Sequence, residues 1–337
     1  MCGISGIYNL KGNEIDQNRL IAMTKIISHR GPNDEGYLLL NTINNTLLTC
    51  YGDDTIEEIR KKNSPIPNSF SADLAFGFRR LSIIDISEKG HQPMCNIDGS
   101  IWIIFNGEIY NYIELKKELI SLGHRFISNS DTEVIIKSYE QWGESCLNHF
   151  NGMWAFSLWD NRNKKLFCAR DRFGIKPFNY YFDGTYFIFA SEIKQILEWK
   201  INKKINEKVI YKSFSIGSFL INSNNTYFEN IKILPHAHYI IIDNNKLKIK
   251  RYYDLNIKFF ETSKLSFSDA SENYKNLFID SIKLRMRSDV PVGSTLSGGM
   301  DSSAIVTVAS TLTSKQFKTF TSYYPLGEKF DERKWVD

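Results

Sequence analysis

The chain opens with Met1-Cys2-Gly3-Ile4-Ser5-Gly6, in which the second residue is a cysteine followed by glycine. An aminopeptidase that trims methionine before a small side chain would leave Cys2 with both a thiol and a free α-amine. Because an α-amine has an unperturbed pKa of roughly 7.7–8, it can take the thiol proton and later return it to a leaving group. The stretch therefore predicts a nucleophile and its base in one residue. A Met-Cys start alone is more often accidental.

Composition restricts the class of protein. The 337 residues indicate two domains, and 42 basic against 38 acidic side chains, spread along the chain, do not indicate nucleic-acid binding. The five cysteines have no paired spacing and no signal peptide precedes them, so we expect reduced thiols in the cytoplasm. No apolar run approaches the ~20 residues that span a bilayer, and zinc-ligand spacing is absent. We expect a cytoplasmic globular protein without membrane contact.

Short β-branched or aromatic runs alternate with amphipathic segments up to about residue 195, which favours a layered α+β domain. The expected helices are Asp16–Ser28, Ile113–Leu122 and Thr132–Trp142, the last with Asp131 as N-cap. The expected strands are Ile4–Tyr8, Tyr37–Leu40, Leu74–Leu81, Ile101–Asn106, Met153–Asp160, Leu166–Ala169, Tyr180–Phe182 and Tyr186–Ala190.

The pattern changes after residue 200. Residues 201–257 are rich in Ile, Lys and Asn and read as a connector with a hairpin. Beyond them, Asp269–Ser288 has helical spacing, Val290–Leu296 is a buried-strand run, and Ser302–Thr311 is a second helix. A strand, a glycine turn and a helix are typical of the start of an α/β domain.

Acyl chemistry at a thiol needs donors for an oxyanion, a cation for a substrate carboxylate and an acid for a substrate ammonium. The amide of Asn106 and the N–H of Gly107 follow a strand and turn at glycine, so both can converge on one oxygen; a plain Asn-Gly hairpin is the alternative. Arg80 ends an apolar strand, where its guanidinium can bind a substrate carboxylate; a surface salt bridge is the structural alternative. Asp131 starts a helix, where an N-cap is the structural alternative.

A second candidate site lies near the end of the chain, in Ser297-Gly298-Gly299-Met300-Asp301-Ser302. Glycine N–H groups between a strand and a helix N-terminus can cradle an anion. The Gly-Lys-Ser/Thr ending of a Walker A loop is absent, so no lysine reaches a γ-phosphate. Pyrophosphate is therefore the expected ligand, with an ordinary Gly-Gly turn as the alternative.

The first group of segments resembles the glutaminase domain of the N-terminal-nucleophile glutamine amidotransferases. The resemblance extends through His29–Gly36, Gly90–Met94, Gly152–Phe156 and Arg170–Pro177. It implies an αββα Ntn-hydrolase sandwich over residues 2–200. It also implies these roles: Cys2 as nucleophile, Asn106 and Gly107 as oxyanion hole, Arg80 on the glutamine α-carboxylate, and Glu108 and Asp131 on its α-amine.

The late loop resembles the pyrophosphate loop of ATP-pyrophosphatase domains, and the two halves in this order resemble the glutamine-hydrolysing asparagine synthetase family. The resemblance implies that residues 258–337 form a truncated N-terminal part of the ATP-binding domain and that Asp301 contacts Mg²⁺. The implied ATP and pyrophosphate site comprises Leu296, Ser297, Gly298, Gly299, Asp301 and Ser302.

That family implies a ligase reaction. Glutamine would be hydrolysed at Cys2, ATP would adenylate the aspartate β-carboxylate, and ammonia would displace AMP to give asparagine. Since the chain stops at Asp337, about one strand after the loop, we expect it to supply only the glutaminase half. Its expected partners are glutamine, ATP and aspartate, with a second copy or a further C-terminal region. Amidation of another carboxylate, a free glutaminase and a glutamine-binding fragment remain alternatives.

Overall fold

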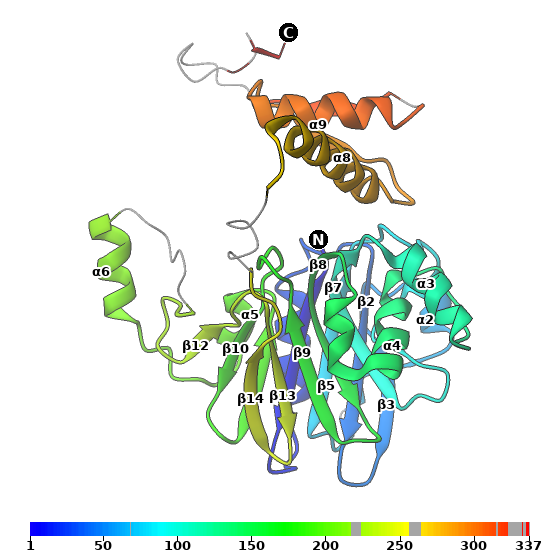
Figure 1. The fold of residues 1–337 in the computed structure, drawn as a ribbon. Helices are drawn as coiled ribbons and strands as arrows, with labels where there is room; N and C mark the ends of the chain where they lie inside the picture. Colours follow the sequence, from blue (N-terminus) through cyan, green and yellow to red (C-terminus); the bar gives the residue numbers. More distant parts are fainter. Residues whose placement is uncertain are drawn as a thin grey trace. The chain divides into compact units, whose positions relative to one another are not determined.

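A computed structural model describes residues 1–67, 69–216, 224–255, 264–314 and 316–322, together with 332, 335 and 336. The chain divides into two compact units, Met1–Asp254 and Leu255–Asp337 (Figure 1). Each unit is described by itself.

The first unit holds an eight-stranded sheet with the N-terminal strand inside it. Strand β1 pairs antiparallel with β5 on one side and β11 on the other, with Gly3 opposite Arg79 and Ser5 opposite Ala190. The strand order is β12 (Ile231–Ile233), β10 (Asn179–Phe182), β11 (Tyr186–Ala190), β1 (Gly3–Asn9), β5 (Leu74–Arg80), β2 (Asp34–Asn41), β3 (Thr46–Tyr51) and β4 (Ser64–Pro65).

A second, six-stranded sheet packs on the first. Its order is β14 (Lys246–Arg251), β13 (His238–Asp243), β9 (Lys165–Arg170), β8 (Gly152–Asp160), β7 (Ile101–Ile109) and β6 (Met94–Cys95). The stretch contains a hairpin, β13–β14, which turns between Asp243 and Lys246, and β13 also pairs with β9. The described part of the stretch 201–254, set apart above as a connector, therefore belongs to the first unit.

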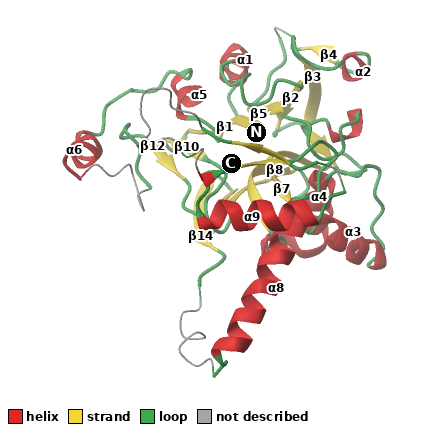
Figure 2. Cartoon of the chain, turned by 90° about the horizontal axis from the view of Figure 1, so that it is seen from above, coloured by secondary structure: helices red, strands yellow, loops and turns green. Residues whose placement is uncertain are grey.

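Helices cover the outer faces of both sheets (Figure 2). Leu20 and Met23 of α1 pack on the first sheet, and Val134 and Ile135 of α4 pack on the second. The helices of this unit are α1 (Gln17–Lys25), α2 (Glu57–Arg60), α3 (Tyr112–Ser121), α4 (Asp131–Trp142), α5 (Ile193–Leu197) and α6 (Glu207–Ile216), with 3₁₀ turns at Glu88–Gly90 and Gly143–Asn148. The expected αββα sandwich is confirmed.

Alternation along the strands sorts the side chains into two sets. Even-numbered residues of three strands, including Ile4, Phe78 and Ile104, point between the sheets into one core. Odd-numbered residues of the same strands, such as Ile7 and Phe105, point toward the helices. Whether a residue of β1, β5 or β7 has an even or an odd number (its parity) therefore decides whether its side chain faces the space between the sheets or the helices.

Two local expectations were wrong. The chain does not turn at Asn106-Gly107, because β7 continues to Ile109 and pairs with β8 throughout. Long-range pairing overrides the local preference of Asn-Gly for a turn. The N-cap of α4 is Ser130, whose hydroxyl accepts from the Thr132 N–H, and Asp131 is the first helical residue.

The second unit contains helices and a parallel strand pair. Its elements are α8 (Phe267–Arg285), β15 (Gly293–Thr295), α9 (Met300–Thr311) and β16 (Lys318–Phe320). Strands β15 and β16 run parallel, as expected for an α/β domain. Strand β15 is shorter than the predicted run Val290–Leu296. Within the described parts of both units, no helix combines the length and apolarity that a bilayer span requires.

Candidate active site

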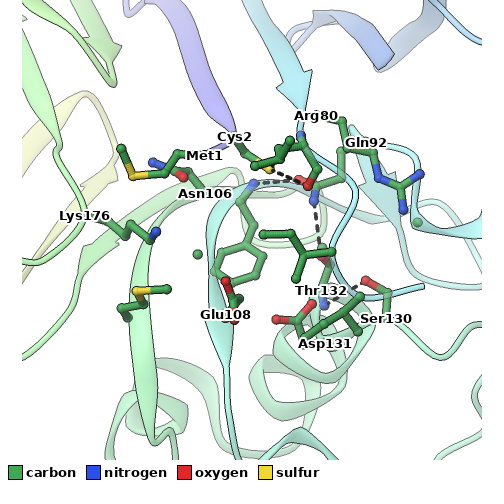
Figure 3. Close-up of a pocket in the computed structure, with 17 residues that line it drawn as sticks. Met1, Cys2, Arg80, Gln92, Asn106, Glu108, Ser130, Asp131, Thr132 and Lys176 are labelled. Atoms are coloured by element: carbon green, nitrogen blue, oxygen red, sulfur yellow. Dashed lines mark hydrogen bonds between the residues drawn. The ribbon is translucent and has the colours of Figure 1, made fainter. Parts of the chain in front are cut away.

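A cavity lies in the first unit where the residues before β1 meet residues of β5, β7 and α4 (Figure 3). Its volume of about 170 Å³ is below the ~300 Å³ at which pockets for drug-sized ligands begin. The cavity therefore suits a small ligand such as an amino acid. All six predicted glutaminase residues line it: Cys2, Arg80, Asn106, Gly107, Glu108 and Asp131.

Cys2 directly precedes β1 and follows its parity, so its half-buried side chain packs at the rim of the inter-sheet core. The next residue is closely packed, because a Cβ on Gly3 would lie 2.2 Å from Ile27 Cδ1 and that side chain would have to move. The Leu81 N–H points at Cys2 Sγ over 3.3 Å. Burial raises the pKa of the thiol, while the Leu81 contact, the chain's terminal amine, Arg80 and Lys176 lower it.

Arg80 lies on the inter-sheet face at the end of β5 and is 4% exposed. Its guanidinium donates to the carbonyl oxygen of Ser87 over 2.9 Å and to that of Asp85. Gly90 makes room for it, since a Cβ there would lie 1.9 Å from Arg80 Nη2. Arg80 forms no salt bridge with any described residue, so its charge is available to a ligand carboxylate.

Asn106 provides the clearest chemical signal in the cavity. Its side chain is 1% exposed, and neither its amide nitrogen nor its amide oxygen has a hydrogen-bond partner among the described residues. An unsatisfied buried amide costs roughly 1–3 kcal/mol. A ligand in the cavity would remove that cost by supplying an acceptor for the Asn106 N–H groups.

The Gly107 N–H points to the same edge of β7. In that strand the Phe105 N–H donates to Gln92 Oε1 (2.6 Å) and the Ile109 N–H donates to Asp131 Oδ2 (2.9 Å). Because N–H groups alternate along a strand, the Gly107 N–H lies on the same side, between these two, and faces the cavity. It is therefore a second donor beside the Asn106 amide.

Two carboxyl groups, Glu108 and Asp131, line the cavity with raised pKa values. Burial, with a smaller contribution from the nearby Glu108, raises the pKa of Asp131 to about 7, although the Ile109 N–H opposes the shift. Burial also raises the pKa of Glu108, while the Lys176 ammonium and the chain's terminal amine lower it. A ligand ammonium would favour the ionised form of both groups.

Sequence reasoning assigned no role to two further lining residues, Gln92 and Lys176. Gln92 joins two walls, because its Oε1 accepts from Phe105 N–H and its Nε2 donates to Thr132 Oγ1 over 3.1 Å. Lys176 is 5% exposed, and burial lowers the pKa of its ammonium. Both lie in stretches that carried the family resemblance, which was the available signal.

The predicted phosphate loop follows β15 in the second unit. Gly298 has φ +73°, a conformation that favours glycine, and Gly299 is the N-cap residue of α9. The Ser302 hydroxyl donates to the Gly299 carbonyl over 3.1 Å and lies 3.0 Å from Ser297 Oγ. Leu296 is anchored to β16 by its N–H bond to the Phe320 carbonyl.

Family models match both parts of the chain. The glutamine amidotransferase domain matches residues 67–253, and asparagine synthase matches residues 273–337.

Similar proteins cover the whole chain. A Methanocaldococcus jannaschii protein provisionally named asparagine synthetase [glutamine-hydrolyzing] 2 is 38% identical, with all of this chain and 62% of that protein aligned. Asparagine synthetase [glutamine-hydrolyzing] 3 of Bacillus subtilis is 34% identical, with all of this chain and 52% of that protein aligned. The chain thus spans between half and two thirds of these relatives' lengths.

A solved structure shares the fold. Glutamine phosphoribosylpyrophosphate amidotransferase from B. subtilis aligns with a TM-score of 0.54 at 18% identity, over 98% of this chain and 68% of that one. The family model over more than half of the chain shows that the chain belongs to the glutamine amidotransferase domain family, and its residues 273–337 match an asparagine synthase domain.

Proposed function

We propose that the first unit hydrolyses glutamine at Cys2 and that the ammonia serves an ATP-dependent synthesis of asparagine. The unsatisfied amide of Asn106, in the same cavity as the Cys2 thiol, carries this proposal. A buried amide without a partner is rare in a folded protein and indicates a ligand atom that completes it. Names of the relatives, glutamine-hydrolysing asparagine synthetases, support the choice of substrate and product.

The chemistry needs removal of Met1, whose side chain is 55% exposed. The Cys2 thiol then gives its proton to the Cys2 α-amine, and the sulfur attacks the side-chain carbonyl carbon of glutamine. Asn106 and Gly107 donate to the oxyanion that forms, an interaction typically worth a few kcal/mol per donor. The protonated amine transfers its proton to the leaving nitrogen, ammonia departs, and water hydrolyses the thioester to glutamate.

Three charged groups would hold the α-carbon end of glutamine. Arg80 would bind the α-carboxylate, because its guanidinium lines the cavity without a carboxylate partner among the described residues. Glu108 and Asp131 would bind the α-ammonium. The charges of ligand and cavity are complementary, which fixes the amide end at Cys2.

The Ser297–Ser302 loop would bind the pyrophosphate part of ATP. Its glycines and the N-terminus of α9 suit an anion. Asp301 fits Mg²⁺ as the one carboxylate of the loop, since protein Mg²⁺ sites commonly combine one or two carboxylates with substrate phosphates. When bound, the ion would neutralise phosphate charge. Aspartate as the amide acceptor rests on the relatives' names alone.

Glutamate release from glutamine tests the proposal. We expect activity in protein from which mass spectrometry shows Met1 to be removed. A residue added before Cys2, or Cys2→Ala, should abolish it. Cys95→Ala is the matched control, because this half-buried thiol does not line the cavity. Unchanged hydrolysis in Cys2→Ala would contradict the proposal. Because we expect this chain to supply only the glutaminase half, it should form no asparagine by itself when ATP and aspartate are added, and the acceptor is tested with a further C-terminal region present.

A further inference from the structure

Lys176 is a charged side chain that the reaction described above does not use. It is 5% exposed and lines the cavity together with Cys2 and Glu108. Figure 3 shows its nitrogen turned toward the cavity. Among the described residues no carboxylate lies within salt-bridge distance of it. A buried ammonium without a partner is costly, so a side chain kept in this position indicates a use for its charge.

The loop that carries Lys176 is built around it. The Asp171 carboxylate accepts the Lys176 N–H over 2.9 Å and the Ile175 N–H over 2.9 Å. From the other side, Arg170 donates to the Lys176 carbonyl oxygen over 2.7 Å and also to the Gly174 carbonyl oxygen. The backbone of Lys176 is thus fixed by two charged residues, which sets where its side chain starts.

We propose that the Lys176 ammonium stabilises the negative charge that forms on the Cys2 sulfur when the thiol gives up its proton. No bond forms to Lys176 in this step, and its proton stays in place. The S–H bond of Cys2 breaks and the proton moves to the α-amine. The inference rests on the proposed glutaminase reaction and deepens it by naming the group that keeps the nucleophile ionisable in a buried position.

Electrostatics of the cavity agree with this role. Burial raises the pKa of the Cys2 thiol and Lys176 opposes that rise. Burial lowers the pKa of the Met1 α-amine, which stands next to Cys2, and Lys176 lowers it further. Lys176 therefore favours the thiolate, and its charge would likewise favour the neutral form of the α-amine that Cys2 carries once Met1 is removed. The other charged groups around Cys2 are Arg30 and Arg80 as cations and Glu108 and Asp131 as acids.

The test compares Lys176→Gln and Lys176→Met, which remove the charge, with Lys176→Arg, which keeps it. The rate of Cys2 alkylation by iodoacetamide is measured against pH in protein lacking Met1, followed by peptide mass spectrometry. Loss of a nearby positive charge disfavours the thiolate, so we expect the alkylation profile of both neutral variants to move up by about one unit. Lys176→Arg should keep the wild-type profile.

Glutamine hydrolysis provides the second readout. Without the Lys176 charge, the rising limb of kcat/KM should move to higher pH by about one unit, giving about a tenfold loss at neutral pH and recovery at alkaline pH. Lys232→Gln is the matched control, because Lys232 lies on the edge strand β12 and donates to Asn225 at the surface. Its profile should not move.

The outcomes separate the two proposals. An alkylation profile that is unchanged in both neutral variants overturns the role of Lys176, whether or not glutamine is hydrolysed. A shifted alkylation profile in a protein that does not hydrolyse glutamine supports the effect of Lys176 on Cys2 and contradicts the proposed function. A pH-independent loss of activity in both neutral variants, with unshifted alkylation, would show that Lys176 acts only on the structure of the loop.

Discussion

Two neighbouring arginines on β5 serve opposite faces of the same strand. Arg79 faces the helices, is 1% exposed, and forms salt bridges with Glu35 (2.6 Å) and Asp54 (2.8 Å). Arg80 faces the space between the sheets and bonds to backbone carbonyl oxygens. On the helix side Arg79 thus has two carboxylate partners. At the inter-sheet cavity, Asn106 stays unsatisfied.

The comparison distinguishes polar groups that stabilise the fold from polar groups that are available to a ligand. A polar group with all its partners contributes to stability, whereas one without partners lowers stability until a ligand supplies them. Sites that bind and react commonly accept such a cost. We therefore expect substitutions around Arg79 to affect unfolding, and substitutions at the cavity to affect glutamine binding and turnover.

Exchanging either arginine for methionine is the most direct test of this contrast. Arg79→Met leaves the buried Glu35 without its cation, which should cost about 3–5 kcal/mol in the free energy of unfolding. Arg80→Met removes the donor of two backbone carbonyl oxygens, so it should cost less, about 1–3 kcal/mol, and raise KM for glutamine about 100-fold, the effect of losing a charged hydrogen bond. Urea unfolding and steady-state kinetics measure both. A large loss of stability in Arg80→Met with normal KM would reverse the assignment.

Substituting two buried asparagines, Asn106 in the cavity and Asn96 outside it, tests the same contrast within one residue type. In Asn106→Ala, loss of an oxyanion donor should lower kcat by about 10²–10³, while the free energy of unfolding stays the same or rises, because an unsatisfied amide is removed. Asn96 is the matched control. It is buried, and its amide bonds to Ser100, Glu140 and the Ile101 N–H. Asn96→Ala should lose stability and retain kcat, and the opposite pattern would contradict the comparison.

The pH dependence of glutamine binding gives a smaller effect. Since the pKa of Asp131 is about 7, the carboxyl group becomes protonated as pH falls through 7, and glutamine affinity should fall severalfold. Asp131→Asn should bind weakly and lose most of this dependence, with Glu108 contributing the remainder. Isothermal titration calorimetry of glutamine binding at several pH values measures this dependence, with Cys2→Ala protein to prevent turnover. Surface Asp53→Asn should keep the wild-type dependence.

The same shift affects stability with a defined sign. The pKa of Asp131 is higher in the folded chain than the usual value near 3.8, so the folded state holds the proton more tightly. Free of ligand, the protein should therefore lose stability as pH rises from about 4 through 7. Asp131→Asn should lose less over that interval. Equal pH dependence of the melting temperature in both proteins would contradict the raised pKa.

Much of this arrangement follows from sequence patterns. The strand runs around Ile4, Phe76 and Ile104 have the predicted positions, because β-branched and aromatic alternation reports a buried sheet face. The residues expected to share a glutamine site do line one cavity. Their catalytic and binding roles remain predictions until measured.

Other features depend on tertiary structure and could not be predicted locally. The pair Asn106-Gly107 predicts a turn locally, and only its pairing with β8 makes it part of a strand. Arg79 and Arg80 are adjacent and of the same type, and only the alternation of side chains along β5 places them on different faces of the sheet. The burial of Lys176 depends on contacts of its loop with distant strands, as in the Arg170 bond to the Leu234 carbonyl oxygen.

The pairing of β1 between β5 and β11 has a consequence for mutation at the DNA level. Because strand parity decides which face a side chain meets, deletion of the Gly3 codon, or insertion of one codon beside it, would turn Cys2 toward the helices if the β1 pairing were kept. The number of residues between Cys2 and the paired part of β1 is therefore fixed. We expect this gene segment to tolerate far fewer in-frame length changes than the loops at the sheet edges.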